Sequence, residues 1–259
     1  MATPAPLRYF ESRARVYRHV WRGSVISTFL NPVLYLAAMG LGLGTLVDEG
    51  SGREIINNLS YLEYLAPGLL AATAMQTTAG DSSFPVMAGI KWVRSYEATL
   101  ASPLTIRDLT LGHFSWVLAR ATFSLAVFVG VMAAFGAVDV VPGVAALGPA
   151  ILTGMAFGPP ITAMTARMQD AQGIAAMFRF GIIPMFLFSG TFFPIEQLPN
   201  WLEPVAWLTP LWHGVELTRG VALGIDTTWS PLIHVAYLAA WMIAGTFAAV
   251  YFLRKRMVT

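Results

Sequence analysis

The chain lacks cysteine entirely, since none occurs among its 259 residues. Disulfides, thiolate metal sites and thiol catalysis are therefore excluded. Lysine is nearly absent too, with only Lys91 and Lys255, and no G-x-x-x-x-G-K-[ST] sequence occurs, so the chain cannot build a P-loop for ATP. The histidines have no metal-ligand spacing, which argues against a metal site. They are His19, His113, His213 and His234.

Charge is scarce as well. Only 12% of the residues are charged, whereas 56% are hydrophobic and the mean hydropathy is +0.62. Such a chain cannot present an ordinary water-soluble surface, so we expect a protein embedded in a membrane. An isoelectric point near 9.0 would suit either nucleic acid or anionic lipid, and the distribution of the charges along the chain favours lipid.

Long apolar runs dominate what remains, and each is long enough for a helix that crosses a bilayer in about 20 residues. We expect an all-α polytopic membrane protein with six transmembrane helices. The expected spans are residues 25–47, 61–84, 113–136, 143–166, 174–192 and 231–253.

Basic charge alternates between the segments that flank these runs. One set of segments holds Arg8, Arg13, Arg15, Arg18, Arg22, Lys91, Arg94, Arg107, Arg167, Arg254, Lys255 and Arg256. The opposite loops are mainly acidic and hold only Arg53 and Arg219. Because cytoplasmic loops are enriched in basic residues, we expect both termini in the cytoplasm.

We expect no signal peptide in the N-terminal residues, because the first apolar run begins only near residue 24 and lacks a cleavage site. Apolar residues recur instead at three- and four-residue spacing, beside a face of arginines. They are Leu7, Phe10, Ala14, Tyr17 and Trp21. This periodicity favours a helix within residues 1–24 that lies in the cytoplasmic interface. The alternative is a basic flank that only fixes the topology.

Residues 85–112 form the longest cytoplasmic connection and carry a helix pattern of their own. Residues 94–100 suit a short helix, which Ser102 and Pro103 end because the residue before proline disfavours the α region. A short helix held between two spans can transmit force. The alternative is a capped loop in solvent, and the residues alone favour neither.

Residues 193–224 are apolar and aromatic enough to enter a membrane, yet prolines divide them into pieces too short to cross it. The prolines are Pro194, Pro199, Pro204 and Pro210. We expect this segment to enter the bilayer from the outer side and return. Trp201, Trp207 and Trp212 would then lie near the headgroups, where indole rings are favoured.

A few charged residues fall inside the expected spans. Asp81 and Arg120 lie toward the cytoplasmic side, where an unpaired charge is costly, so they either pair or Arg120 extends to the interface. Arg179 has the same two alternatives. The spacings Gly40-x-x-x-Gly44 and Gly154-x-x-x-Gly158 favour close helix packing.

Several stretches together resemble the membrane subunit of an ABC-2 type exporter, and most of all the nodulation protein J group. They are NPVLYLAAMGLGLGTLV, YLEYLAPGLLAATAMQTT, RSYEATLASPLTIRDLTLG and FSGTFFPIEQLPNWLEPVAWLTPLWHGVELTRGVALG. Daunorubicin-resistance permeases are more distantly similar. The resemblance implies one transmembrane domain over residues 1–259, with an interfacial N-terminal helix, a coupling helix within 85–112 and an outer re-entrant hairpin at 193–224. It also implies a bacterial plasma (inner) membrane.

The same resemblance implies the partners of the chain. A second permease subunit, identical or related, would pair with it, and two copies of a separate ATPase would bind ATP and magnesium. Coupling to that ATPase is implied for Arg94, Tyr96, Glu97, Ser102, Pro103 and Arg107. A gate formed by the outer hairpin is expected to include Phe193, Pro194, Pro199, Trp201 and Pro210. No cofactor, metal or catalytic residue is expected on this chain, and no nucleic acid partner.

The sequence is compatible with two candidate functions. The first is an exporter subunit that moves an amphiphile outward, such as a lipid-linked oligosaccharide, a glycolipid or a hydrophobic drug. The second is a membrane-embedded enzyme for lipid-linked substrates, which would need clustered acidic or histidine residues at one face. The outer acidic residues are widely spaced, which favours transport. They are Glu196, Glu203, Glu216 and Asp226.

Overall fold

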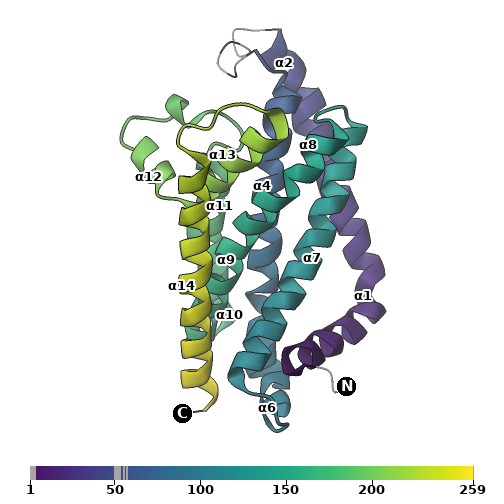
Figure 1. The fold of residues 1–259 in the computed structure, drawn as a ribbon, viewed down its shortest axis with the longest axis vertical. Coiled ribbons are helices and arrows are strands. Elements are labelled where there is room, and N and C mark those ends of the chain that lie inside the picture. Colours follow the sequence, from purple (N-terminus) through teal and green to yellow (C-terminus); the bar gives the residue numbers. More distant parts are fainter. Residues whose placement is uncertain (1–3, 50–53, 55, 57, 259) are drawn as a thin grey trace.

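The computed structural model describes residues 4–49, 54, 56 and 58–258, and every regular element within them is helical (Figure 1). Arg53 and the side chain of Arg22, counted above among the charges, lie outside this description. Five helical stretches of the described residues are long and apolar enough to cross a membrane. They are Phe29–Asp48, Ile106–Ala134, Val140–Arg167, Ala171–Phe188 and Pro231–Met257.

The helices follow the expected spans closely, with short helices between them. The first half of the chain forms α1 (Ala5–Tyr35), the π-helix η1 (Leu36–Leu43), α2 (Gly44–Asp48), α4 (Tyr61–Asp81), α5 (Phe84–Met87), the π-helix η2 (Ala88–Trp92), α6 (Ser95–Leu100) and α7 (Ile106–Ala134). The second half forms α8 (Val140–Ala145), α9 (Leu147–Arg167), α10 (Ala171–Met177), the π-helix η3 (Phe178–Ile182), α11 (Ile183–Phe188), the 3₁₀ helix η4 (Ile195–Gln197), α12 (Glu203–Trp207), α13 (Pro210–Leu223) and α14 (Pro231–Met257).

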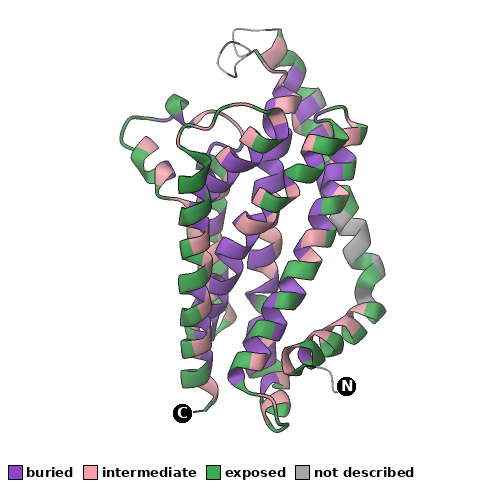
Figure 2. Ribbon diagram, viewed as in Figure 1, coloured by how far each residue is buried: buried purple, intermediate pink, exposed green. Residues whose placement is uncertain are grey.

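Helix α4 is the most enclosed long helix of the bundle, and Figure 2 shows buried residues along almost its whole length. It begins at a capping box, in which the backbone N–H of Glu63 donates to the Ser60 hydroxyl and the Glu63 carboxylate accepts from the Ser60 backbone. Its 21 residues extend about 31 Å at 1.5 Å per residue. Helices α7, α9 and α13 pack around it.

Small residues allow this close packing. A Cβ at Gly154 would lie 2.9 Å from the Thr78 side chain and 3.1 Å from the carbonyl oxygen of Ala74 in α4. A Cβ at Gly158 would meet the Ser82 hydroxyl at 3.3 Å. The expected packing role of this glycine pair is therefore confirmed. Gly40 has a similar role, since its Cβ would overlap the Leu62 side chain of α4.

The two termini lie at the same end of the bundle, together with α6 (Figure 1). The expected interfacial helix and the beginning of the first span form one continuous helix, α1, and η1 and α2 complete the span. The N-terminal part of α1 is inclined across this end before the chain turns along the bundle (Figure 1). Phe10 and Tyr17 on this inclined part contact the ring of Trp116 in α7, edge to face. The segment is therefore attached to the bundle by aromatic packing as well as by its chain connection.

The outward faces of the bundle are apolar, as a lipid environment requires. Phe180, Leu232 and Phe247 are each about three-quarters exposed, at 77%, 75% and 74%. Exposed apolar side chains on every outer helix would be unfavourable in water. The exposed apolar side chains and the composition therefore both indicate a multi-pass membrane protein (Figure 2).

The helices of residues 193–224 differ in length more than those of the hairpin that we expected. It contains the two short helices η4 and α12, followed by the 14-residue helix α13, which packs against α4, α9 and α14. The expectation that Trp212 faces headgroups is wrong, because its indole is enclosed by protein and only 1% exposed. Trp201 is 73% exposed, in agreement with a surface position.

Candidate functional site

Helix α6 projects a set of charged and polar side chains from the end of the bundle that holds the termini. It follows Arg94, whose φ of +54° is in the left-handed region that non-glycine residues rarely adopt. The Arg94 guanidinium makes two short contacts to Glu97, with Nε 2.9 Å from Oε2 and Nη2 3.0 Å from Oε1. The ion pair places Glu97 beside Arg94 on an exposed surface.

The residues after α6 continue this surface. The Ser102 hydroxyl donates to the carbonyl of Thr99 at 2.6 Å, and Pro103 follows in an exposed turn. A capping box between Thr105 and Asp108 then begins α7, with Arg107 exposed beside it. Of the six residues predicted to couple to an ATPase, five are exposed here. They are Arg94, Glu97, Ser102, Pro103 and Arg107.

Tyr96 differs from the other five because its side chain points into the protein and is 2% exposed. Its ring lies against Gly89, where a Cβ would be 2.5 Å from the nearest ring carbon, and meets the Tyr9 ring edge to face at 6.3 Å. Burial raises the pKa of the Tyr96 hydroxyl well above its ordinary value, and burial also raises the pKa of Tyr9. Tyr96 therefore attaches α6 to both η2 and α1.

A hydrophobic cluster extends this attachment into the bundle. A Cβ at Gly112 of α7 would lie 2.5 Å from the carbonyl oxygen of Pro6, so the glycine allows α1 to approach α7 closely. The buried members of the cluster come from seven helices: Tyr9, Val86, Ile90, Tyr96, Ile106, Leu109, Ala166 and Leu253. Movement of α6 would therefore be transmitted to the long helices through direct packing.

Asp81 and Arg120 form an ion pair, with 2.7 Å between Asp81 Oδ1 and Arg120 Nη1. This decides between the two alternatives for these residues in favour of pairing. Arg179, which had the same alternatives, is exposed on η3.

Arg219 is a buried residue whose role the sequence analysis missed. Its Nε donates to the carbonyl of Tyr64 at 3.2 Å and its Nη2 donates to the carbonyl of Gly190 at 2.9 Å. The guanidinium also lies 3.9 Å from the centre of the Tyr64 ring, and Gly68 leaves the space that it occupies. One side chain thus links α13, α4 and the turn after α11, where Gly190 has a φ of +78°.

Two histidines that the sequence places far apart are neighbours in the structure. Nδ1 of His213 lies 2.9 Å from Nδ1 of His234, and Nε2 of His213 lies 3.0 Å from the carbonyl oxygen of Trp207. The spacing of the histidines along the chain did not predict this contact, and the rings of Trp212, Trp229 and Tyr237 surround the pair. Within the described residues, no three His, Cys, Asp or Glu side chains form a group that could hold a metal ion.

The residues predicted to form an outer gate do not lie together. Phe193 and Pro194 line an apolar groove, whereas Pro199 and Trp201 lie exposed between η4 and α12, and Pro210 is buried at the start of α13. Their common role as a gate stays a prediction.

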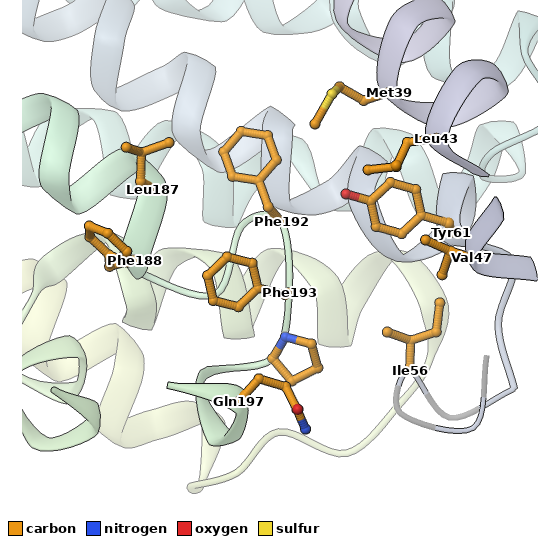
Figure 3. Close-up of a pocket in the computed structure, with 11 residues that line it drawn as sticks. Met39, Leu43, Val47, Ile56, Tyr61, Leu187, Phe188, Phe192, Phe193 and Gln197 are labelled. Atoms are coloured by element: carbon orange, nitrogen blue, oxygen red, sulfur yellow. The ribbon is translucent and has the colours of Figure 1, made fainter. Parts of the chain in front are cut away.

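The apolar groove lies at the end of the bundle opposite α6, between the first span and α11. Its cavity has a volume of about 540 Å³. Figure 3 shows Phe192 and Phe193 facing Met39, Leu43 and Tyr61 across it. The residues that line the groove are Met39, Leu43, Val47, Ile56, Tyr61, Leu187, Phe188, Phe192, Phe193, Pro194 and Gln197. A lining with almost no polar groups favours an apolar ligand.

Comparisons with known proteins agree with this arrangement. A family model described as ABC-2 type transporter matches residues 11–223. Nodulation protein J of Rhizobium meliloti (strain 1021) is 30% identical over 247 residues, which cover 93% of this chain and 90% of that protein. Nodulation protein J of Neorhizobium galegae is 27% identical over 242 residues, covering 93% and 89%. The probable multidrug ABC transporter permease YbhR of Escherichia coli (strain K12) is 27% identical over 220 residues, covering 77% and 55%.

Proposed function

The chain belongs to the ABC-2 type transporter family, and on that premise we propose that it is the permease subunit of an exporter for amphiphilic molecules. A separate ATPase, in two copies, would bind ATP and magnesium and supply the energy. The substrate would be a lipid-linked oligosaccharide, a glycolipid or a hydrophobic drug. Two copies of this chain would pair in the bacterial inner membrane, with all four of their termini in the cytoplasm.

The proposed topology has six spans, with α4 as the crossing that joins the five apolar stretches. Its length of about 31 Å matches the hydrocarbon thickness of a bilayer. An even number of spans agrees with two termini at the same end of the bundle (Figure 1). Residues 193–224 would form a re-entrant segment, and the prolines that divide it support this topology.

The apolar groove between the first span and α11 is the observation that carries the proposal. It opens on the side of the bundle where Ala171–Phe188, the least buried of the five apolar stretches, faces outward. Part of its lining comes from η1, whose eight residues form a π-helix, a rare conformation found frequently at functional sites. The tail of an amphiphile would lie in this groove, between the subunit and its partner or the surrounding lipid.

The surface of α6 is the proposed contact for the ATPase, with Glu97 as the principal charged residue. We expect Glu97→Arg to lower substrate-stimulated ATP hydrolysis by a factor of about ten or more, because an inverted charge at an interface costs several kcal/mol and each 1.4 kcal/mol is tenfold. Membrane insertion should be unchanged. Hydrolysis would be measured with the complex reconstituted in lipid nanodiscs.

Two further variants separate an interface effect from a local one. Glu49→Arg places the same substitution at the opposite end of the bundle and should have no effect on hydrolysis. The double variant Arg94→Glu with Glu97→Arg keeps the ion pair of α6 but reverses its direction, and it should stay impaired. Full coupled activity of the Glu97→Arg complex would contradict the proposed contact.

A further inference from the structure

A second cavity, of about 310 Å³, lies nearer the α6 end of the bundle between α1, α4 and α7. In contrast to the apolar groove, its lining is mainly polar. The residues are Asn31, Pro32, Tyr35, Thr73, Gln76, Thr77, Gly80, Asp81, Arg120 and Ser124. Four of them form one face of α4, since Thr73, Gln76, Thr77 and Gly80 follow the i, i+3, i+4, i+7 spacing of a helix.

One acceptor in this lining has no partner. The Asp81 side chain is only 9% exposed, and while Oδ1 accepts from Arg120, Oδ2 is buried without any hydrogen bond. A buried polar atom without a partner costs about 1–3 kcal/mol, and more when it is charged. At membrane depth, lipid tails supply no donor. Oδ2 has almost no accessible surface, so the Asp81 side chain would turn to meet a donor that enters this cavity.

We propose that the polar cavity binds the headgroup of the transported amphiphile, and that this headgroup donates hydrogen bonds and carries no negative charge. This inference rests on the proposed export function. A hydroxyl or a primary ammonium group would donate to Oδ2 of Asp81. The amide of Gln76 and the hydroxyl of Thr77 would supply further hydrogen bonds.

The sign of the charge follows from the ion pair. Arg120 already compensates Asp81, so the cavity as a whole has no excess positive charge to attract an anion. The free oxygen of Asp81 would repel a carboxylate or phosphate placed against it, at close range and low dielectric. A hydroxylated or ammonium headgroup meets no such repulsion.

One face of the first span contributes lining residues to both cavities. Asn31 and Tyr35 line the polar cavity, whereas Met39, Leu43 and Val47 line the apolar groove, and all five are spaced by four residues. Residues four apart lie on the same helix face. The wider i→i+5 turns of η1 reduce the drift of that spacing around the axis. An amphiphile could therefore contact one continuous face with its headgroup and its tail.

The test compares headgroups on a constant tail. Four dodecyl amphiphiles would be used: dodecyl maltoside, dodecylamine, dodecyltrimethylammonium and dodecanoate. Stimulation of ATP hydrolysis would be measured in the nanodisc complex with the ATPase. We expect maltoside and amine to reach half of their maximal stimulation at concentrations about ten-fold lower than the other two compounds. This ratio corresponds to a difference in binding free energy of about 1.4 kcal/mol. The amine and the trimethylammonium compound share a charge, so their difference reports hydrogen-bond donation together with the larger size of the trimethylammonium group.

The variant for this test is Gln76→Leu with Thr77→Val, which removes two polar groups and keeps the ion pair. It should raise the half-saturating concentration of maltoside and amine about ten-fold and leave that of trimethylammonium unchanged. Thr246→Val on α14 is the matched control and should change neither. Equal responses to all four headgroups, or an unchanged response of the double variant, would overturn the headgroup site while the export function stands. If no amphiphile stimulates an ATPase that is active and coupled, the proposed substrate class fails, and the site fails with it.

Discussion

Replacing Arg219 by methionine is expected to lower the free energy of unfolding by about 3 to 5 kcal/mol, one of the two largest effects predicted for this chain. Methionine fills much of the same space but removes the Arg219 donors from the carbonyls of Tyr64 and Gly190, and the Gly190 oxygen then keeps the longer, 3.4 Å bond from the Tyr64 hydroxyl. The stacking of the guanidinium on the Tyr64 ring is lost as well. The helices α13 and α4 and the turn at Gly190 would then separate more easily.

Thermal unfolding of the purified protein in detergent measures this effect. Arg219→Lys keeps the charge but cannot bridge two carbonyls and stack on a ring together, so it should fall between methionine and the unchanged protein. Arg254→Met, at an exposed position near the end of α14, is the matched control and should have little effect. An Arg219→Met protein as stable as its Arg254→Met counterpart would show that the three contacts contribute nothing net.

The second large effect is expected at Tyr96. Tyr96→Ala removes a fully buried ring that fills the space beside Gly89, a change that typically costs about 3–5 kcal/mol in a core. Because this ring attaches α6 to η2 and α1, the loss should appear first as uncoupling. We expect ATP hydrolysis by the complex to continue while ATP-driven export falls by a factor of about ten or more, each tenfold corresponding to 1.4 kcal/mol of lost coupling.

Tyr96→Phe provides the matched comparison, since it keeps the ring and its packing and removes only the hydroxyl. Export by this variant should stay close to that of the unchanged protein. Elution as a single species with the ATPase bound would establish that Tyr96→Ala is still assembled. Normal export by an assembled Tyr96→Ala complex would contradict the role of the buried ring as the attachment of α6.

Features set by neighbouring residues could be predicted from the sequence. The end of α6 at Leu100, just before Ser102 and Pro103, agrees with expectation because proline geometry acts locally. The positions of most long helices agree as well, because they follow from the length of hydrophobic runs. The close packing at Gly154 and Gly158 was also predictable, since small residues at that spacing leave a groove on any helix. The ion pair of Asp81 with Arg120 was one of two alternatives predicted from the sequence, because an unpaired charge inside a membrane span is costly.

Features set by helix pairing could not be predicted in this way. The sequence placed Arg219 among the charges of an outer loop. Its buried position depends on the packing of α13 against α4, which the sequence does not show. The same pairing of α13 with α14 brings His213 to His234, which are 21 residues apart. The burial of Tyr96 could not be predicted either, because a helix of six residues is too short for its buried face to be identified from periodicity.

The subunit would therefore have three parts with different roles. A charged helix at one end would receive the ATPase, a packed aromatic cluster would pass its movement to the long helices, and one face of the first span would carry the substrate. The polar part of that face lies near α6 and the apolar part near the opposite end. Export would then move an amphiphile along this face from the cytoplasmic side outward.

The most direct test of export is transport by the complex in sealed vesicles. The chain and its ATPase would be reconstituted, and movement of a fluorescent dodecyl maltoside derivative between leaflets would be followed by quenching from outside. We predict movement that requires ATP, is lost when the ATPase is inactivated, and is slowed by Tyr96→Ala. A complex that hydrolyses ATP under control of the permease but leaves the amphiphile in its original leaflet would contradict the account.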